Sequence, residues 1–272
     1  MRKPKVSVIM SCYNENSNLL KLSVESIINQ TFEDFEFLIA LDKPDNMEAL
    51  EILEYYAKLD SRVKLFVNEY NYGRSRSRNL LVAKSNGTYI AIMDADDISL
   101  PNRLKEEIET LEKRDVDVVG SWIAEFNDYF GKNVFSYRKV PEHHKDIVRY
   151  AKFRSPVNHA TALFKKNLFI YVEGYDESLH HGEDYHLFVK MIKHGASFYN
   201  IQDVLLLCRL NDYFRKRRGL KIFKQDYLLM KKIYNLGFLN RIEFLANLAL
   251  RLSYRILPDN LFKKAFDLQR RF

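Results

Sequence analysis

The chain has 272 residues, of which 47% are hydrophobic and 14% aromatic, with only 9 Gly and 6 Pro. This composition excludes a disordered protein and provides a core for one large α/β domain, or one domain with an appendage. The net charge is +7, and the two cysteines, Cys12 and Cys208, exclude a disulfide framework and favour a reducing compartment. No segment approaches the roughly 18 apolar residues of a membrane-spanning helix.

The N-terminus imitates a secretory signal, because the basic segment Arg2–Lys5 precedes the apolar run Val6–Met10. The apolar run ends before Asn14-Glu15-Asn16, and no small-residue cleavage site follows. The segment is therefore predicted to be a buried first strand.

Short β-rich runs then alternate with helical patterns, which is typical of βαβ units and a largely parallel sheet. The predicted strands are Val6–Ser11, Phe35–Leu41, Val63–Asn68, Tyr89–Met93 and Asp117–Ser121. Helices are predicted to begin near Asn18, Asp45, Gly73 and Pro101.

From about Ile123 to Lys139 the pattern changes to aromatic-rich alternating segments interrupted by Asn127-Asp128 and Gly131-Lys132. This pattern predicts a hairpin rather than another crossover. A parallel half followed by a mixed half implies one domain, residues 1–212, in which two substrate sites flank one cleft.

The C-terminal extension, residues 213–272, holds 15 Lys and Arg against 4 Asp and Glu, a balance of +11 that leaves −4 for residues 1–212. An amphipathic helix is predicted from apolar residues at three- and four-residue steps: Ile242, Leu245, Ala249, Leu252 and Ile256. Three arginines fall together beside this face: Arg241, Arg251 and Arg255. The helix either packs on its own domain with its arginines in water or lies on an anionic membrane, and the charge favours the membrane.

Three carboxylates stand in the turn Asp94-Ala95-Asp96-Asp97, directly after the apolar run Tyr89–Met93. Carboxylates at such spacing repel one another unless they have a basic partner, a raised pKa or a hard divalent cation. The end of a strand is also where open α/β sheets bind ligands. We therefore predict a cation site here, although one Asp capping the next helix with the others solvated is the simpler alternative.

The 27 residues Asn71–Asp97 resemble family 2 of the inverting glycosyltransferases, because they contain N-Y-G-R-S-R-S-R-N, G-T-Y-I and D-A-D-D in the family's order. Val6–Glu15 is similar to the family's opening strand and turn, and Asp42 falls at its acidic position after the second strand. Gly182–Leu187 resembles its G-E-D-x-x-L segment. The resemblance implies a GT-A fold, a Rossmann-like and mostly parallel sheet with a mixed acceptor-side half.

The resemblance also implies a donor and metal site. Asp96 takes the principal metal or diphosphate role, Asp97 supports it and Asp94 faces the ribose. A carboxylate-held Mg²⁺ or Mn²⁺ stabilises the departing diphosphate as a Lewis acid. The guanidinium of Arg78 suits phosphate oxygens, and Gly73 allows close backbone approach at a helix start. The remaining residues of the predicted nucleotide-sugar site are Ser11, Tyr13, Asn14, Glu15, Asp42 and Ala95.

The acceptor hydroxyl has to lose its proton as it attacks, and Asp184 is the predicted base. Glu183 orients Asp184, helps to bind the acceptor or is the base itself. Direct displacement requires no nucleophilic Ser or Cys. On the acceptor side, His159 lies where the family often has a His, and His181 is close enough to Glu183 to line the cleft.

Two sets of residues near this site are expected to contribute less. Asn211, in Cys208-Arg209-Leu210-Asn211, stands where many members have a metal-binding His. Its carbonyl is a weaker ligand, so we expect Asp96 and the diphosphate to hold the metal. Arg74 and Arg76 are expected to be solvated.

Two other functions are alternatives to a glycosyltransferase. A nucleotidyltransferase that makes nucleotide sugars would have a Gly-rich loop with Lys or Arg after the first strand, where this chain has Cys12–Asn16. A non-catalytic membrane-bound scaffold predicts decayed acidic motifs, and both motifs are intact. We therefore predict a metal-dependent hexosyl- or N-acetylhexosaminyltransferase that moves a sugar from a nucleotide-sugar donor, expected to be a UDP-sugar.

The expected acceptor is a glycan or a lipid-linked sugar in capsule or lipopolysaccharide synthesis. We expect the protein to be cytoplasmic and peripheral at the inner face of a bacterial plasma membrane, bound through residues 213–272. Nucleic acid is not an expected partner, since the charge would suit it but no recognition motif is present.

Overall fold

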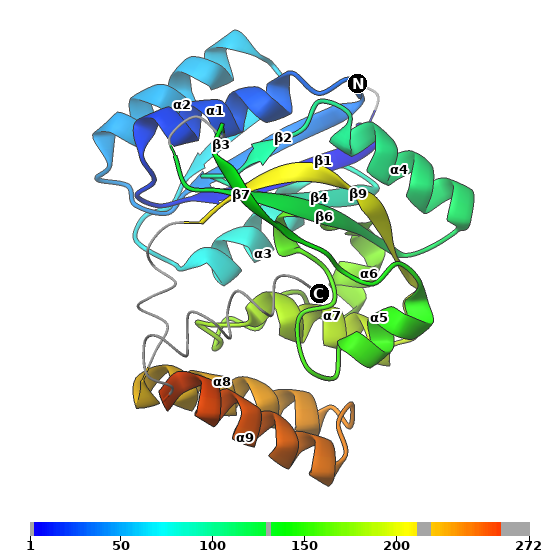
Figure 1. Cartoon of the computed structure of the whole chain (residues 1–272). Helices are drawn as coiled ribbons and strands as arrows, with labels where there is room; N and C mark the ends of the chain where they lie inside the picture. The colour runs from blue at the N-terminus through cyan, green and yellow to red at the C-terminus, as the bar shows by residue number, and fades with distance from the viewer. Residues whose placement is uncertain (1–2, 129–131, 211–218, 257–272) are drawn as a thin grey trace.

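The structure is a computed structural model that describes residues 3–128, 132–210 and 219–256. Figure 1 shows a twisted sheet between two helical layers, with a pair of C-terminal helices beneath it. Asn211 and the basic segment 214–218 lie outside the described residues, so the predictions made for them stay predictions.

Strands and helices alternate through the first half as predicted. The strands are β1 (Val6–Cys12), β2 (Phe35–Leu41), β3 (Val63–Val67), β4 (Tyr89–Asp94), β5 (Ile98–Ser99), β6 (Val118–Phe126), β7 (Val134–Arg138), β8 (Leu163–Lys165) and β9 (Phe198–Arg209). The helices are α1 (Ser17–Ile28), α2 (Met47–Leu59), α3 (Arg74–Lys84), α4 (Arg103–Arg114), α5 (His144–Tyr150), α6 (Lys166–Tyr171), α7 (Glu183–Lys193), α8 (Leu220–Asn235) and α9 (Arg241–Ile256), with a 3₁₀ turn η1 at His159–Thr161.

The strands form one sheet with the order β3-β2-β1-β4-β8-β6-β9-β5, and β7 pairs with β6. The half β3-β2-β1-β4 is entirely parallel. The other half is mixed, since β8 is antiparallel to both β4 and β6 whereas β9 is parallel to β6. This arrangement confirms the predicted parallel half, the mixed half and the β6–β7 hairpin.

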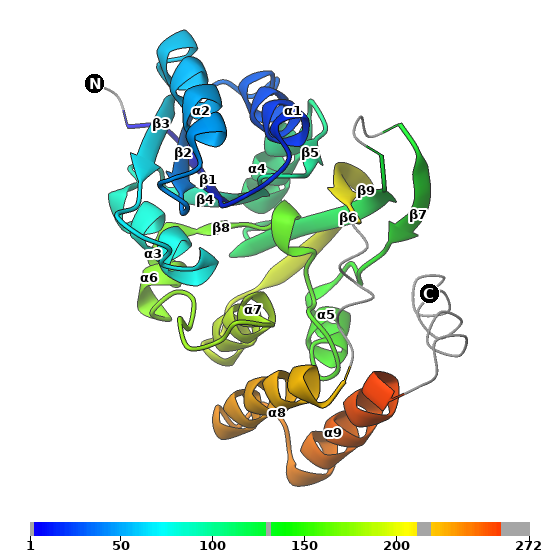
Figure 2. The same ribbon diagram turned by 90° about the vertical axis from the view of Figure 1, so that its left-hand side faces the viewer.

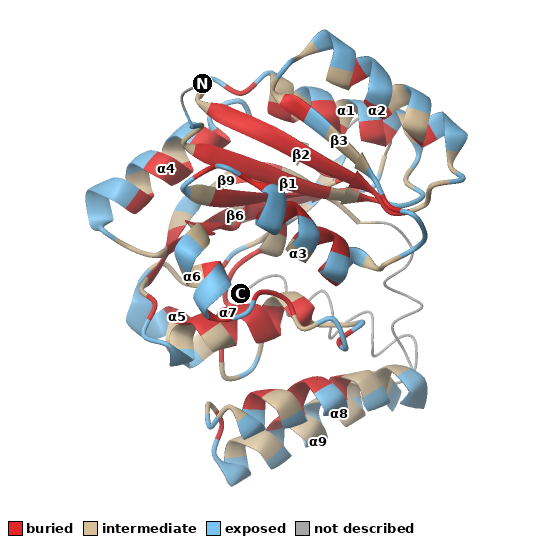
Figure 3. Cartoon of the chain, turned by 180° about the vertical axis from the view of Figure 1, so that it is seen from behind, coloured by how far each residue is buried: buried red, intermediate tan, exposed pale blue. Residues whose placement is uncertain are grey.

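Helices cover both faces of the sheet (Figure 2), with α1, α2 and α4 on one face and α3, α6 and α7 on the other. The buried strands supply both cores, because successive side chains point to opposite faces. In β1, Val8 and Met10 pack into one hydrophobic cluster while Ile9 packs into the other. Figure 3 shows the resulting buried band along the central strands.

The strand predicted at Asp117–Ser121 is longer than expected, because β6 continues through the start of the predicted hairpin to Phe126. Its pairing with β9 shifts register on both sides of Trp122. The irregularity lets one strand serve the central sheet at its beginning and the hairpin with β7 at its end.

The C-terminal helices pack on the domain rather than standing apart from it. Leu229, Met230 and Ile233 of α8 share a hydrophobic cluster with Tyr185 and Val189 of α7. The predicted boundary between the domain, residues 1–212, and the C-terminal extension, residues 213–272, stays a prediction, although α8 and α7 have a common core. Within the described ranges, no helix has both the length and the apolar character that crossing a membrane requires.

Candidate active site

The predicted site residues converge on one cavity of about 840 Å³. It lies where β1 and β4 end, which is the edge of an open α/β sheet that binds ligands. Of the predicted residues only Asn14 does not line it, and Asn14 Oδ1 instead accepts a hydrogen bond from Lys43 Nζ at 3.0 Å. The others are Ser11, Tyr13, Glu15, Asp42, Gly73, Arg78, Asp94, Ala95, Asp96, Asp97, His159, His181, Glu183 and Asp184.

Asp94, the first aspartate of the acidic turn, already has a cationic partner. Its Oδ1 accepts a hydrogen bond from Arg78 Nη2 at 2.5 Å. Burial alone would raise the pKa of Asp94, but Arg78 and then His159 outweigh burial and hold the pKa well below its usual range. Asp94 is therefore ionised and neutralised within the protein.

Asp96 and Asp97 form no ion pair within the described residues. Burial, together with Asp94 and Glu15, raises the pKa of Asp96 to about 7. Burial, followed by the charges of Asp96 and Asp94, raises the pKa of Asp97 well above its usual range. Asp97 Oδ1 accepts the backbone N–H of Arg209 at 2.8 Å, which ties the acidic turn to the end of β9. The charge of Arg209 lowers the pKa of Asp96 in part, but burial and the neighbouring carboxylates outweigh it.

The part of the chain that the structure describes contains no group of three or more His, Cys, Asp or Glu side chains able to hold a metal ion by themselves. Asp97 is only 2% exposed, whereas Asp96 is partly exposed on the cavity wall. A cation at this wall would therefore take Asp96 as its main protein ligand and need further oxygens from a bound molecule.

Arg78 lies between the two acidic motifs. Its Nη2 contacts Asp94, and its Nη1 lies 3.6 Å from Glu183 Oε1. Phosphate binding by Arg78 stays a prediction, and the structure shows that two carboxylates already engage this guanidinium. The expectation that Arg74 is solvated is wrong in part, because its half-exposed side chain places Nε 2.6 Å from Glu183 Oε1. Four residues apart on α3, these arginines fix Glu183.

Asp184 has more open surroundings than its neighbour Glu183. Its Oδ2 accepts a hydrogen bond from Ser155 Oγ at 3.4 Å. Burial alone would raise the pKa of Asp184, but His159, the Tyr185 N–H and Arg138 outweigh burial and lower it. Asp184 is thus an ionised carboxylate on the cavity wall, as a proton acceptor has to be.

His159 lies close to both acidic motifs, and its place on the acceptor side stays a prediction. Its Nδ1 lies 3.9 Å from Asp94 Oδ2, and its Nε2 is 2.9 Å from the Tyr175 hydroxyl. Because Asp184 also feels its charge, His159 is electrostatically connected to both carboxylates.

Asp42 organises the loop that leads into α3. Its carboxylate accepts hydrogen bonds from Asn68 Nδ2 at 2.7 Å and from the backbone N–H groups of Tyr72 at 2.8 Å and Gly73 at 2.9 Å. Gly73 has a φ of +81°, which glycine adopts without strain. A Cβ there would meet no atom within 4 Å, so this φ rather than crowding favours glycine. Nucleotide contact by Asp42 stays a prediction.

The turn after β1 is held by Glu15. Its Oε2 accepts hydrogen bonds from the Tyr13 N–H at 2.7 Å and from Cys12 Sγ at 3.1 Å. The ring of Tyr13 is consequently presented at the mouth of the cavity, where it is 45% exposed. This exposed aromatic face can stack on a base.

Helix α8 presses against the turn that presents the G-E-D motif. Gly182 has a φ of +73°, and a Cβ on it would lie 2.3 Å from Leu229 Cδ2. Any larger residue at position 182 would therefore strain the turn and push the end of the Leu229 side chain aside. Helix α8 thus packs directly against the turn that carries Glu183 and Asp184.

A buried ion network also joins the C-terminal helices to the turn that carries the G-E-D motif. Asp226 of α8 is fully buried and accepts hydrogen bonds from Arg255 Nε at 2.8 Å and Arg251 Nη1 at 3.2 Å. His181 Nε2 lies 3.6 Å from its Oδ1. Burial alone would raise the pKa of Asp226, but His181, Arg255 and Arg251 lower it well below its usual range. The prediction that Arg251 and Arg255 accompany a membrane-facing surface is wrong, because both point into the protein.

Several cavity residues were not identified from the sequence. Arg138 ends the β6–β7 hairpin, Arg154 follows α5, Arg209 ends β9, and Tyr254 comes from α9. Only Arg209 had a local signal, since it stands in the segment compared with the family's final strand. Tertiary packing brings the other three to the cavity.

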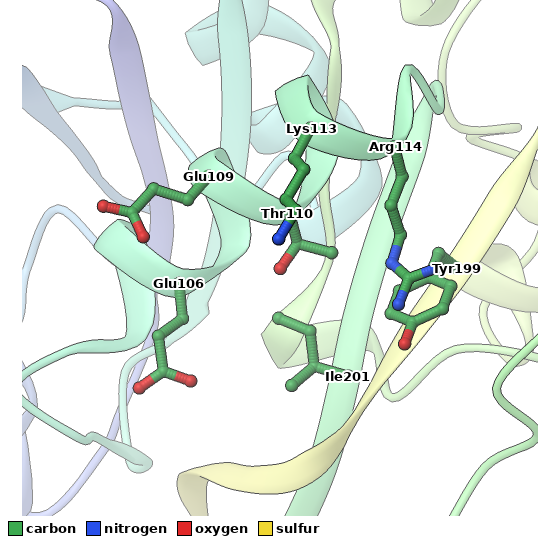
Figure 4. A pocket seen from close by; sticks show the side chains of 7 residues that line it. All are labelled: Glu106, Glu109, Thr110, Lys113, Arg114, Tyr199 and Ile201. Carbon is green, nitrogen blue, oxygen red and sulfur yellow. The ribbon is translucent and has the colours of Figure 1, made fainter.

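A second groove lies between α4 and β9 (Figure 4). Its charged rim includes Glu106, Glu109 and Lys113, and the Arg114 guanidinium lies 3.7 Å from the centre of the Tyr199 ring. None of the predicted site residues lines it. The chemistry predicted from the sequence is confined to the larger cavity.

Comparison with known proteins agrees with this geometry. Residues 7–169 match the family described as Glycosyl transferase family 2. An uncharacterized glycosyltransferase of Methanocaldococcus jannaschii is 36% identical over 90% of this chain and 85% of its own length. The Escherichia coli protein named UDP-Gal:alpha-D-GlcNAc-diphosphoundecaprenol beta-1,3-galactosyltransferase is 30% identical over 94% of this chain and 93% of its own.

Solved structures share the fold. TarS of S. aureus, determined as the fragment 1–349 in complex with UDP, superposes with a TM-score of 0.67 at 20% identity, covering 97% of this chain and 75% of that fragment. The mannosyltransferase PcManGT from Pyrobaculum calidifontis, in complex with GDP-Man and Mn²⁺, gives 0.62 at 16% identity, covering 98% and 74%. The predicted GT-A fold is confirmed, and the matched segment contains the D-A-D-D turn. The chain belongs to glycosyl transferase family 2.

Proposed function

We propose that this family 2 glycosyltransferase moves a hexosyl or N-acetylhexosaminyl group from a UDP-sugar to a hydroxyl of a lipid-linked acceptor, with inversion, in cell-surface polysaccharide synthesis. The observation that carries the proposal is the single cavity in which Arg78 contacts both acidic motifs, through Asp94 and Glu183. TarS was determined with UDP, and the E. coli relative is named for a UDP-Gal donor and a diphosphoundecaprenol-linked acceptor.

The end of the cavity at β1 and β4 suits the donor. Tyr13 offers a ring for the base, and Asp96 is the carboxylate best placed to hold a divalent cation together with the diphosphate. Mn²⁺ or Mg²⁺ bound there would act as a Lewis acid on the leaving diphosphate. The raised pKa of Asp96 supports this role, because an uncompensated carboxylate gains most from a cation.

At the other end, Asp184 is the proposed base, and the geometry favours it over Glu183. Glu183 is only 4% exposed and its carboxylate is held by Arg74 and Arg78. Asp184 is ionised and has the hydroxyl of Ser155 as its side-chain hydrogen-bond donor. Removal of the acceptor proton by Asp184 during in-line attack accounts for inversion without a covalent intermediate.

We further propose that α9 rests on the cytoplasmic face of an anionic plasma membrane. The outer side of the helix is apolar, with Ile242 80%, Leu245 54% and Ile256 62% exposed. Its polar residues Asn247 and Arg251 face the domain instead, bonded to the backbone carbonyls of Lys152 and Phe153. An exposed apolar stripe of this kind suits the headgroup boundary better than water.

Donor binding is tested with the full-length protein, Mn²⁺ and a panel of nucleotide sugars. We expect one UDP-sugar to be bound and slowly hydrolysed without acceptor, and Asp96→Ala to abolish both the hydrolysis and the electron paramagnetic resonance signal of Mn²⁺ bound with UDP. Asp203→Ala, an exposed carboxylate of β9, is the control that should change neither. Failure of every nucleotide sugar to bind would contradict the proposal.

Membrane binding is tested by flotation with anionic phosphatidylglycerol vesicles. We expect the double variant Ile242→Glu/Leu245→Glu to bind at least about tenfold more weakly, because two apolar anchors are lost and two like charges are added. Ile170→Glu on α6 alters an exposed apolar residue outside α9 and should leave flotation unchanged. Equal binding by the α9 variant and the wild type would rule out this surface.

A further inference from the structure

Two arginines line the acceptor end without a direct ion pair within the described residues, although the charge of Arg138 acts on Asp184. Arg138 and Arg154 line the cavity, both partly buried, and neither forms an ion pair within residues 3–128, 132–210 and 219–256. The neighbouring arginines differ, because Arg74 and Arg78 bind Glu183, and Arg251 binds Asp226. Partly buried cations without a partner are expected to receive an anion.

The protein holds the backbone of Arg138 and the side chain of Arg154 in place. The backbone carbonyl of Arg138 accepts a hydrogen bond from Asn158 Nδ2 at 3.2 Å, and the same Nδ2 donates to the carbonyl of Ser121 at 2.7 Å. The Arg154 guanidinium lies 5.4 Å from the centre of the Tyr150 ring, and its Nη1 donates to the Tyr150 hydroxyl at 3.3 Å. The Arg154 side chain therefore needs little ordering before it binds a ligand.

The pair lies beside the proposed base. Ser155, the residue after Arg154, donates its hydroxyl to Asp184, and the charge of Arg138 helps to lower the pKa of Asp184. An anion held by these arginines would thus lie in the part of the cavity that contains the proposed base. The same wall continues through Arg251 and Tyr254 onto α9, whose outer face is apolar.

We infer that Arg138 and Arg154 form a subsite for the diphosphate that joins the acceptor sugar to its lipid. This inference rests on the proposed function and names the group by which the acceptor is recognised. The planar fork of arginine matches phosphate oxygens in bidentate geometry, and two such forks match the two phosphates. A uronic acid in the acceptor would supply an anion too, but with one charge for two arginines. The position next to α9 also leads the lipid toward the apolar surface.

The probe is geranyl diphosphate, which carries the lipid diphosphate without any sugar. Its dissociation constant is measured by calorimetry on the full chain with saturating UDP and Mn²⁺, so that the donor site is filled. We expect Arg138→Gln and Arg154→Gln each to weaken binding at least about tenfold, since each removes a charge-assisted contact. Arg138→Lys and Arg154→Lys should restore part of the affinity, because lysine retains the charge but not the fork.

Arg149→Gln is the matched control, since Arg149 lies on α5 with 68% of its side chain exposed, and it should bind the probe like the wild type. UDP affinity is measured for every variant, and its retention shows that a variant is folded and that the donor site is intact. Unchanged geranyl diphosphate binding in both Gln variants would overturn the inference. Tighter wild-type binding of geranyl glucuronide would overturn it in favour of a carboxylate. Absence of UDP binding in the wild type would instead refute the proposed function.

Discussion

The two ends of the cavity treat buried carboxylates in opposite ways. At the donor end, burial and mutual repulsion raise the pKa of Asp96 to about 7 and that of Asp97 well above its usual range. At the acceptor end, Asp226 is fully buried, yet His181, Arg255 and Arg251 hold its pKa well below its usual range. The pKa of the same residue type is therefore shifted in opposite directions depending on the cations within reach, and Asp94 at the donor end, paired with Arg78, behaves like Asp226.

This difference separates a ligand site from a structural contact. Asp226 has its positive charges built into the chain, so its network fixes α8 and α9 against the turn that carries Glu183. Asp96 forms no ion pair within the described residues and the charge of Arg209 offsets its burial only in part, so its proposed role is to bind a cation from solution. A carboxylate that the protein leaves uncompensated at a cavity wall is available for ligand chemistry, whereas a compensated one holds the fold together.

The largest expected effect concerns Asp184, the ionised carboxylate of the cation-rich end. Asp184→Asn should lower sugar transfer by about 10²–10⁴-fold, because the amide cannot accept the acceptor proton. UDP affinity should stay within about twofold, since the donor end is unchanged. Single-turnover transfer and calorimetry measure the two quantities. Transfer that survives in Asp184→Asn but not in Glu183→Gln would move the base to Glu183.

The same substitution at the two ends should change stability in opposite directions. Asp226→Asn removes the partner of two buried arginines and should lower the free energy of unfolding by about 3 kcal/mol. Asp96→Asn removes a charge that is only partly compensated and should raise it by at most about 4 kcal/mol at pH 7.5 without metal. Folding raises the pKa of Asp96 to about 7 from an ordinary value of about 3.9, and each pKa unit corresponds to about 1.4 kcal/mol. Urea denaturation in EDTA measures both. Equal changes in the two variants would show that the contrast between the ends has no energetic consequence.

The parallel half of the sheet and the place of the acidic turn at a strand end follow from the sequence, whereas the donor roles of the residues in that turn stay predictions. Phe35–Leu41 was predicted with its observed bounds because seven consecutive buried residues leave little choice of boundary. The D-A-D-D turn was predicted because its residues are contiguous and follow a buried strand, whose end determines where the carboxylates point. Local chemistry was enough in both cases.

The acceptor end was predicted less completely because it is assembled from distant segments. Periodicity showed that α9 has an apolar face, but it could not show which face meets the domain. Asp226, on another helix, reverses the expected orientation because a buried carboxylate draws Arg251 and Arg255 inward. Arg138 and Arg154 carry no sequence signal either, since the β6–β7 hairpin and the loop around Asn158 bring them together.

The smallest expected effect is the pH dependence of the free energy of unfolding. Asp96 and Asp226, at the two ends, affect it in different pH ranges. For Asp96, a folded-state pKa of about 7 exceeds the unfolded value of about 3.9, so its contribution is full below pH 4 and is lost as the pH rises to 7. The lowered pKa of Asp226 acts in the other direction, giving stability above pH 4 that is lost on further acidification.

In metal-free wild-type protein, Asp96 should make the free energy of unfolding fall by at most about 1.4 kcal/mol per pH unit between pH 4.5 and 6.5. Asp96→Asn should remove this fall. His186, whose pKa is lowered to about 4 chiefly by burial, titrates in the same window with the opposite sign, but it is present in both proteins and cancels in the difference. Asp226→Asn should leave the slope in that window unchanged and alter it only below about pH 4. Urea unfolding at stepped pH in EDTA measures the slopes. If the free energy of unfolding has the same pH slope in the wild type and in Asp96→Asn, a cation within the chain already compensates the acidic turn. The donor end would then resemble the Asp226 network.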